Sequence, residues 1–383
     1  MNIEAFARAF AEAEAPGMLA ELEAVVNVNS GTANLAGNRV MLDCFEALFR
    51  RSGLERGGQV EAHGRPHLIL TGGDGDRHIL LVGHVDTVFP EGHPFQRFEV
   101  RGERAHGPGV NDMKGGLIVA AATVRALGEL GALGRTRVTA FLNSDEEVQS
   151  PTSKALLLDL CARERFDMAL VFEGGRKTGA LVRARKGVGK YVLASQGRAA
   201  HSGMSHEAGI NAIEELAAKV GPIQALTDYD KGVTLNVGTF HGGVGRNTVP
   251  PEARCEVDVR IWRPEDAAPV DEALRRIAAQ VRLAGASTTI EGGIGRPPWP
   301  VNEASDRLVG LWAAAGEALG VCVEAEATGG GSDGNFTHQV GIPTLDALGP
   351  QGGHPHTPEE YIEIASLESR VALHTVALAR WLD

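Results

Sequence analysis

The sequence is poor in cysteine and aromatic residues, and these shortages limit the class of protein. Its 383 residues include only 4 cysteines, and aromatic residues make up 5% of the chain. Disulfide-stabilised secreted domains and thiolate metal sites need cysteines that are dense or closely spaced. Here they lie far apart, without CxxC spacing, at Cys44, Cys161, Cys255 and Cys322. We therefore expect four reduced core cysteines in a cytoplasmic protein.

Positive charge is also scarce. The 37 Lys and Arg residues against 49 Asp and Glu residues give a formal net charge of -12, and no run of basic residues occurs. Nucleic-acid binding relies on clustered positive charge, so we expect no nucleic-acid partner. No stretch approaches the roughly 20 apolar residues of a membrane span, and the acid-containing N-terminus lacks a signal-peptide pattern. We expect no membrane partner either.

Short aliphatic runs are present, and they alternate with longer Ala- and Leu-rich segments. The runs predict buried strands, and the longer segments predict helices between them. In the first half, the expected strands are 68–70, 79–82, 138–142 and 168–172, and the expected helices are 113–130 and 153–165. One or two helices are expected before residue 27, with Pro16-Gly17 as punctuation. This alternation predicts an α/β domain with a mainly parallel sheet.

The pattern changes near residue 187. Strands are expected at 190–195, 234–240 and 253–260, with helices at 211–225 and 269–284, and the later elements are 306–319, 344–348 and 367–382. Such segregated strands and helices predict a smaller α+β domain. We expect a discontinuous first domain, residues 1–186 and 297–383, interrupted by a second domain, residues 187–296.

Acidic residues and a histidine follow the expected strands of the first domain. His84 and Asp86 come after the run 79–82, Glu146 and Glu147 lie in the string NSDEE, and Glu173 follows 168–172. Ligands of open α/β sheets bind at this edge of the sheet. Each motif alone also fits a structural role, such as a solvated acidic loop or a loop-capping aspartate beside a hydrogen-bonded histidine.

Two further strings add ligand-type residues. Asp112 lies in GPGVNDMKGG at the start of an expected helix, where an N-cap is the alternative role. The string GGHPHTPEEY contributes His354 and His356. Together the strings supply two or more imidazoles and at least four carboxylates, a set suited to two divalent ions of the zinc type. With a glutamate nearby to move a proton, this set predicts metal-assisted hydrolysis.

Six strings carry a resemblance to a known family. In chain order they are GHVDTVFP, GPGVNDMKGG, NSDEE, FEGG, GRAAHSG and GGHPHTPEEY. They resemble the di-zinc exopeptidases and deacylases that include bacterial glutamate carboxypeptidase, acetylornithine deacetylase and the aminoacylases. The resemblance covers nearly the whole chain. It implies a catalytic di-metal domain, residues 1–186 and 297–383, and a dimerisation or lid domain, residues 187–296.

The resemblance also implies a ligand set. One zinc would be bound by His84, both would be bridged by Asp112, and the other ligands would be Glu147, Glu173 and His356. His356 is preferred to His354 because it lies in the HTPEEY frame.

Supporting roles follow from the same resemblance. Asp86 would orient His84, Glu146 would be the general acid/base, and the peptide bond between Asp112 and Met113 would be cis. One departure concerns Gln149, because relatives often have glycine two residues after the ligand glutamate.

In the second domain the resemblance implies three further functional residues. His201, in GRAAHSG, would reach the active site of the other subunit and stabilise the oxyanion, although a lone loop histidine is often structural. Asn247 would donate to the oxyanion or to a substrate carboxylate. Arg296, in GRPP, would hold the α-carboxylate of the substrate, the alternative being a solvated loop arginine. Sharing of His201 implies a homodimer formed through the second domain.

The expected function is metal-dependent hydrolysis of an amide that releases a C-terminal or N-acylated amino acid. Glu173 resembles the glutamate of the carboxypeptidases and deacylases, whereas aminopeptidases have aspartate there. A glutamate-type leaving group is a more specific version of this expected function. The cofactors would be two Zn²⁺ per subunit, with Co²⁺ or Mn²⁺ also suited. The alternatives are an N-acetyl amino-acid deacetylase and a catalytically silent binding protein, and the presence of Glu146 with all five ligands argues against the latter.

Overall fold

The computed structural model describes residues 2–383, which divide into two units. The first unit comprises the chain up to Ala184 together with Val301–Ala327 and Ser332–Asp383. The second comprises Arg185–Pro300 and Thr328–Gly331. Residues 328–331 thus belong to the second unit, although the sequence analysis assigned them to the first domain.

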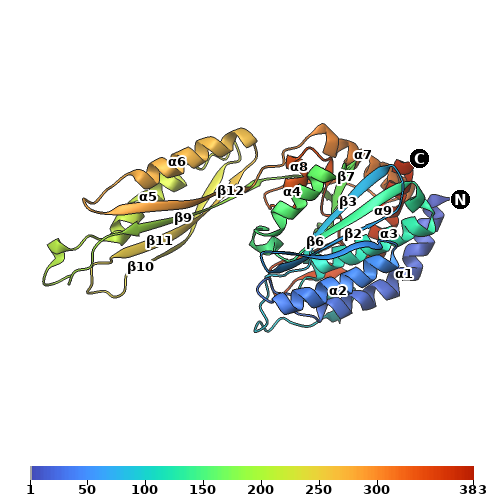
Figure 1. Cartoon of the computed structure of the whole chain (residues 1–383), viewed down its shortest axis with the longest axis horizontal. Coiled ribbons are helices and arrows are strands. Elements are labelled where there is room, and N and C mark those ends of the chain that lie inside the picture. The colour runs from blue at the N-terminus through green and yellow to red at the C-terminus, as the bar shows by residue number, and fades with distance from the viewer. Residues whose placement is uncertain (1) are drawn as a thin grey trace. The chain divides into compact units, whose positions relative to one another are not determined.

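A six-stranded sheet forms the centre of the first unit (Figure 1). Its order is β1 (Arg56–Ala62), β2 (Arg65–Gly72), β6 (Thr136–Asn143), β3 (Arg77–His84), β7 (Met168–Val171) and β14 (Thr344–Leu345). The pairs β6–β3, β3–β7 and β7–β14 are parallel, whereas β1–β2 and β2–β6 are antiparallel. The predicted α/β class with a mainly parallel sheet is confirmed.

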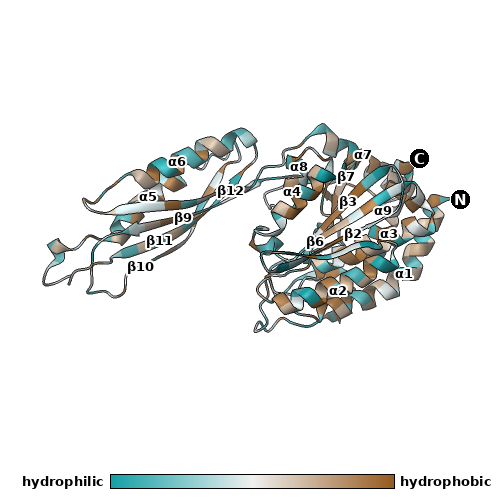
Figure 2. Ribbon diagram, viewed as in Figure 1, coloured by the Kyte–Doolittle hydropathy of each residue, from teal (hydrophilic) through white to brown (hydrophobic). Residues whose placement is uncertain are grey.

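Helices cover both faces of this sheet, because both faces of its strands are apolar. One core contains residues of α1 (Ile3–Val26), α2 (Leu35–Arg51), α3 (Gly115–Glu129), α7 (Glu303–Ala318) and α9 (Ala365–Leu382). The other contains residues of α4 (Ser153–Arg163) and α8 (Gly334–Gln339). Along β3, Ile79 and Leu81 face the first core, and Leu80 and Val82 face the second. Figure 2 shows hydrophobic residues concentrated on the central strands and mixed with hydrophilic ones along α1 and α2.

A small sheet of the same unit brings two distant segments together. Its order is β15 (Gly352–Gly353), β16 (Tyr361–Glu363), β5 (Arg104–His106) and β4 (Glu99–Arg101). Tyr361 lies opposite His106 in the antiparallel pair β16–β5. The strings GGHPHTPEEY and GPGVNDMKGG therefore lie side by side, although more than two hundred residues separate them, roughly the length of a whole domain.

The second unit contains an antiparallel sheet and two helices. The sheet order is β10 (Thr234–Gly242), β11 (Glu252–Ile261), β9 (Gly187–Gln196) and β12 (Ser287–Arg296). Helices α5 (Ala212–Gln224) and α6 (Ala267–Ala279) contribute Leu216 and Leu274 to a separate core. The predicted smaller α+β unit is confirmed as an architecture. A two-stranded pair, β8 (Leu181–Arg185) and β13 (Ala325–Thr328), has most of its residues in the first unit and completes the named strands.

Several local predictions need correction. α1 runs without interruption through Pro16, and the sequence analysis did not identify α2, β1 or β12. β12 was missed because its Ser, Thr and Gly residues alternate only weakly between buried and exposed positions. All four cysteines are unpaired, but the prediction that they are core residues is wrong for Cys322, which is exposed.

Residues 2–383 contain no helix that is both long enough and apolar enough to cross a membrane.

Candidate active site

The site lies where three neighbouring strands end. β6, β3 and β7 are parallel, with His84 of β3 opposite Asn143 of β6 and Val82 opposite Val171 of β7. The residues that follow each strand therefore meet at one edge of the sheet.

Asp112 lies between two histidines. His84 Nε2 is 3.0 Å from Asp112 Oδ1, and His356 Nε2 is 3.2 Å from Asp112 Oδ2. Each carboxylate oxygen of Asp112 thus faces a different imidazole. Ligand atoms of His84, Asp112 and Glu147 all lie within 4.8 Å of one another.

Each histidine has a second carboxylate beside it. His84 Nε2 is 3.8 Å from Glu173 Oε1, and His356 Nε2 is 3.1 Å from Glu147 Oε2. The side chains therefore form two imidazole and carboxylate pairs that share Asp112. The structure brings together all five residues for which metal binding was predicted.

His356 makes these contacts, whereas His354 packs against Tyr361, with ring centroids 5.8 Å apart. The peptide bond between Asp112 and Met113 is cis, at the position that the resemblance implies.

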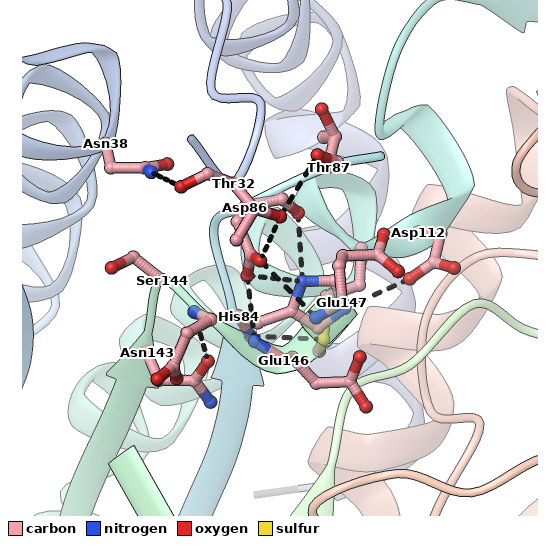
Figure 3. Close-up of polar contacts among 12 residues, drawn as sticks. Thr32, Asn38, His84, Asp86, Thr87, Asp112, Asn143, Ser144, Glu146 and Glu147 are labelled. Carbon is pink, nitrogen blue, oxygen red and sulfur yellow. Dashed lines mark hydrogen bonds and ion pairs between the residues drawn. The ribbon is translucent and has the colours of Figure 1, made fainter. Parts of the chain in front are cut away.

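Asp86 connects the end of β3 to the loop after β6 (Figure 3). Its Oδ1 accepts a hydrogen bond from the Glu146 backbone N–H at 3.2 Å, and its Oδ2 accepts one from the Glu147 N–H at 3.3 Å. The Thr32 hydroxyl donates to Oδ2 at 2.8 Å. His84 Nδ1 lies 3.0 Å from the Asp86 carbonyl oxygen and 3.4 Å from Oδ1. Asp86 is fully buried, so it holds the His84 ring and the Glu146-Glu147 backbone in fixed positions.

The loop that carries Glu146 and Glu147 has an internal support. Asp145 accepts hydrogen bonds from the Thr152 N–H at 2.7 Å and the Thr152 hydroxyl at 2.6 Å. Gln149 has a φ of 73°, in the left-handed region that glycine adopts easily. The loop therefore takes a glycine-type backbone at the position where the sequence departs from the family pattern.

The electrostatics of the cluster favour the binding of cations. Burial alone would raise the pKa of Asp112, but the facing imidazoles of His356 and His84 hold this pKa well below its usual range. Burial, followed by the charge of Asp112, raises the pKa of Glu147 to about 8 and also raises the pKa of Glu173. The hydrogen bonds to Asp112 and Glu147 raise the pKa of His356 to about 11.

Without cations, protons on Glu147 and His356 offset the crowding of the carboxylates, while Asp112 remains ionised. Imidazole nitrogens and carboxylate oxygens that converge in this way are the donors that divalent zinc-type ions prefer. The residues present therefore fit a pair of divalent ions.

The sequence analysis missed Glu360. This residue is buried and accepts hydrogen bonds from the backbone N–H groups of Gly109 at 3.2 Å, Asn111 at 2.9 Å and Asp112 at 3.0 Å. It thereby ties the loop of Asp112 to the segment that follows His356. Its position in GGHPHTPEEY was visible, but the string was used only to choose between two histidines.

The sequence analysis also missed Asp333, in the glycine-rich string at 328–335. Its carboxylate accepts hydrogen bonds from the Asn143 amide and the Ser150 hydroxyl, on either side of the Glu146-Glu147 loop. The concentration of glycine around an aspartate was the available signal.

The remaining predicted site residues lie in the second unit. His201 and Asn247 are exposed on adjacent loops, which a hydrogen bond from the Ser202 N–H to the Asn247 carbonyl joins at 3.0 Å. Arg296 is the last residue of β12, paired with Val188 of β9, and only 3% of it is exposed. Arg296 is therefore not a solvated loop arginine, and direct binding of a substrate would require its exposure to change.

A sequence model of peptidase family M20/M25/M40 matches residues 80–380. The chain belongs to this family. The predicted family resemblance is thereby confirmed. The chain is one of a family of peptidases and amidohydrolases.

Individual relatives of this M20 family member carry different activities in their names. Carboxypeptidase G2 from Pseudomonas sp. (strain RS-16) is 30% identical over 373 residues, which cover 94% of this chain and 88% of that protein. Succinyl-diaminopimelate desuccinylase from Variovorax paradoxus (strain S110) is 26% identical over 324 residues, covering 79% and 81%. The M20 family metallo-carboxypeptidase from Sulfolobus solfataricus has the same fold, with a TM-score of 0.79 at 17% identity over 95% of this chain and 99% of that chain.

Proposed function

We propose that this M20 family member hydrolyses the amide bond between an acyl group and a C-terminal amino acid, with divalent metal ions as cofactors. The observation that carries the proposal is the position of Asp112, with one carboxylate oxygen toward His84 and the other toward His356. Similarity to a carboxypeptidase over most of both chains supports this choice among the family's reactions.

Two Zn²⁺ ions are the proposed cofactors, and Co²⁺ or Mn²⁺ also suits these donors. His84 and Glu173 would hold one ion, Glu147 and His356 the other, and Asp112 both. When bound, such ions polarise the amide carbonyl and lower the pKa of the attacking water.

The chain's own residues handle protons and orientation. Glu146 would take a proton from the attacking water and deliver it to the leaving nitrogen. Its backbone N–H bonds to Asp86, which supports a fixed position next to Glu147. Asp86 would hold His84 in the orientation needed for binding, as carboxylates beside metal-binding histidines do.

The second unit would complete the site. We propose that His201 stabilises the oxyanion in the active site of the other subunit of a homodimer, with residues 187–296 as the dimerisation and lid domain. Asn247 would donate a hydrogen bond to the oxyanion or to a substrate carboxylate. We also propose Arg296 as the residue that binds the substrate α-carboxylate. Its burial, described above, argues against direct contact. A cytoplasmic location is proposed on the four unpaired cysteines.

A substrate panel identifies the amino acid that the enzyme releases. A glutamate-type leaving group is proposed first, and deacetylation of N-acetyl amino acids is the second candidate. Substrates that vary the C-terminal residue and the acyl group separately distinguish the two, and N-succinyl substrates cover the activity named for the desuccinylase relative.

Metal dependence is tested on the same sample. Activity should disappear after dialysis against a strong chelator and return on addition of Zn²⁺, Co²⁺ or Mn²⁺. Glu146→Gln should lower kcat by about 100-fold or more while metal content stays that of the wild type. Full activity of the chelated protein would refute the proposed function.

A further inference from the structure

The loop between β6 and α4 carries Glu146 and Glu147, and a carboxylate from a distant segment holds both of its ends. Asp333 Oδ2 accepts a hydrogen bond from the Asn143 side-chain amide at 2.5 Å, and its Oδ1 accepts one from the Ser150 hydroxyl at 2.6 Å. Asn143 is the last residue of β6, and Ser150 comes shortly before α4. The two bonds therefore enclose the whole loop.

The far end of this loop has a backbone that needs support. Gln149 and Ser150 have φ values of 73° and 55°, so two consecutive residues other than glycine adopt the left-handed conformation. Such residues are strained and persist only where their surroundings hold them. The Ser150 hydroxyl bonds to Asp333, and the Ser150 N–H donates to the Asp145 carbonyl oxygen at 2.8 Å. These two bonds fix the left-handed end of the loop.

The alternative role for Asp333 is to stabilise α8. Asp333 is the N-cap of this six-residue helix, a position where aspartate usually accepts a hydrogen bond from the backbone of the helix. Its side chain makes no capping bond. Asp333 is buried, and its two carboxylate oxygens face Asn143 and Ser150 instead. Capping of α8 therefore does not explain this carboxylate.

The backbone that carries Asp333 is itself fixed. The hydroxyl of neighbouring Ser332 donates to the Asp346 carboxylate at 2.6 Å, and the Ser332 N–H donates to Asn335 Oδ1 at 3.0 Å. Asp346 directly follows β14, which lies next to β7 in the central sheet. Asp333 is thus anchored to the sheet at whose edge the site lies, so it can hold the loop in a constant position.

We propose that Asp333 is a positioning residue for Glu146, the proposed general acid/base. Asp333 holds Asn143 and Ser150, while Asp86 holds the middle of the same loop through the Glu146 N–H. Proton transfer requires the carboxylate to lie within hydrogen-bond reach of the water, so a loosened loop lowers the rate of the chemical step. This inference rests on the proposed function, because it takes Glu146 as the group that moves the proton.

The first test asks whether Asp333 acts through Glu146. With excess metal, Asp333→Ala should lower kcat by about 10- to 100-fold and change KM by less than about threefold. In the Glu146→Gln background, the same substitution should change kcat by less than about threefold, because the group that it positions is already lost. Equal losses in the two backgrounds would overturn the inference, since general damage to folding or to metal binding lowers both.

The second test needs neither metal nor activity. In the metal-free protein, Asp333→Ala should speed hydrogen exchange of the backbone N–H groups of residues 146–150 by about tenfold or more, because both ends of the loop are released. Asp167→Ala is the control. Asp167 accepts a hydrogen bond from the His78 N–H at 2.8 Å, at the opposite edge of the sheet, and its loss should leave loop exchange and kcat unchanged. Unchanged loop exchange in Asp333→Ala would overturn the inference.

Ser150→Ala keeps the inference testable if Asp333→Ala folds poorly. It removes one of the two bonds and no charge, so kcat should fall by about threefold or more with Glu146 present and stay constant in the Glu146→Gln background. An unchanged kcat in Ser150→Ala with Glu146 present would count against the inference.

Failure of the proposed function is seen in a different sample. A wild type that hydrolyses no acyl amino acid refutes the proposed function, whatever the variants do. A wild type that is active, and that loses activity in Glu146→Gln as expected, leaves the proposed function standing. The comparison of backgrounds and the exchange rates then decide the role of Asp333 alone.

Discussion

At the scale of single residues, the site depends on carboxylates that act through backbone hydrogen bonds. Asp86 binds the N–H groups of Glu146 and Glu147, and Glu360 binds those of Gly109, Asn111 and Asp112. These two buried carboxylates hold the loops that carry the metal-ligand candidates. Charge-assisted hydrogen bonds of this kind are stronger than neutral ones, so each loop loses freedom before any ion binds.

Glu360→Ala is expected to weaken metal binding, because the loop of Asp112 loses three hydrogen bonds. We expect metal affinity to fall by about 10- to 100-fold, with kcat reduced at subsaturating metal and partly restored by excess metal. Affinity is measured by chelator competition on the whole protein, without reference to activity. Glu359→Ala, at the exposed neighbouring position, is the control. Unchanged affinity in Glu360→Ala would show that the loop is held without this carboxylate.

Substitution of Gln149 tests the left-handed backbone conformation of its loop. Gln149→Val should destabilise the protein by about 1–2 kcal/mol, because a β-branched residue tolerates a positive φ poorly. Gln149→Gly should leave the free energy of unfolding within about 1 kcal/mol of the wild type, since relief of strain offsets the added freedom of the unfolded chain. Urea unfolding measures both. Equal stability of the two variants would contradict the observed backbone conformation.

At the scale of elements, packing against α9 holds the ends of β7 and β14. His374 of α9 accepts a hydrogen bond from the Trp312 indole N–H of α7 through Nδ1, at 2.8 Å, and its Nε2 lies 2.8 Å from the Leu348 carbonyl oxygen. Its ring also packs edge-on against Phe172, the residue before Glu173. With Nδ1 accepting, Nε2 must carry the proton, so the ring is neutral.

Because His374 is neutral in the folded protein, we expect the protein to lose stability in acid. Burial lowers the pKa of His374 to about 3 in the folded protein, from 6.5 for the unperturbed group. The unfolded chain therefore binds a proton here that the folded chain does not, so stability falls as pH drops from about 6.5 toward 3, by up to about 1.4 kcal/mol per pH unit. His374→Gln should reduce the slope of this dependence, by up to about 1.4 kcal/mol per pH unit, in urea unfolding between pH 6.5 and 4.5.

A second measurement keeps that prediction testable if His374→Gln folds poorly. In the wild type, NMR should find the His374 ring neutral at pH 5. His63→Gln, on the exposed turn between β1 and β2, serves as the control and should follow the pH dependence of the wild type. A charged His374 ring at pH 5 would refute the prediction.

At the scale of the whole molecule, the proposed homodimer makes a quantitative prediction. If His201 acts in the active site of the other subunit, Glu146→Ala and His201→Ala should each be nearly inactive as pure proteins. Co-expressed, they should form mixed dimers with one complete site, giving about a quarter of wild-type activity for random pairing. Differently tagged subunits allow mixed dimers to be purified and assayed. Inactive mixed dimers would exclude sharing of His201 between subunits.

Local patterns account for much of the fold and of the site. Aliphatic runs mark β3, β6 and β7, and His84, Glu147 and Glu173 lie at the ends of these strands or in the loops that follow them. Strands with both faces buried need continuous apolar residues, so they are visible without tertiary information. The sequence analysis did not identify α2, although its buried residues Met41, Phe45 and Leu48 recur at helical spacing. β12 was not visible, because its weakly alternating residues are stabilised by what they pack against.

The sequence by itself determined a candidate donor set, because imidazoles and carboxylates at strand ends, in a family-like order, specify which side chains could bind metal ions. Only the tertiary structure decided how the donors are arranged. It brought His356 to Asp112 through the pairing of β16 with β5, made Glu360 the anchor of the Asp112 loop, and buried Arg296 at the end of β12. Each depends on strand register between distant segments, which residue spacing along the chain does not encode.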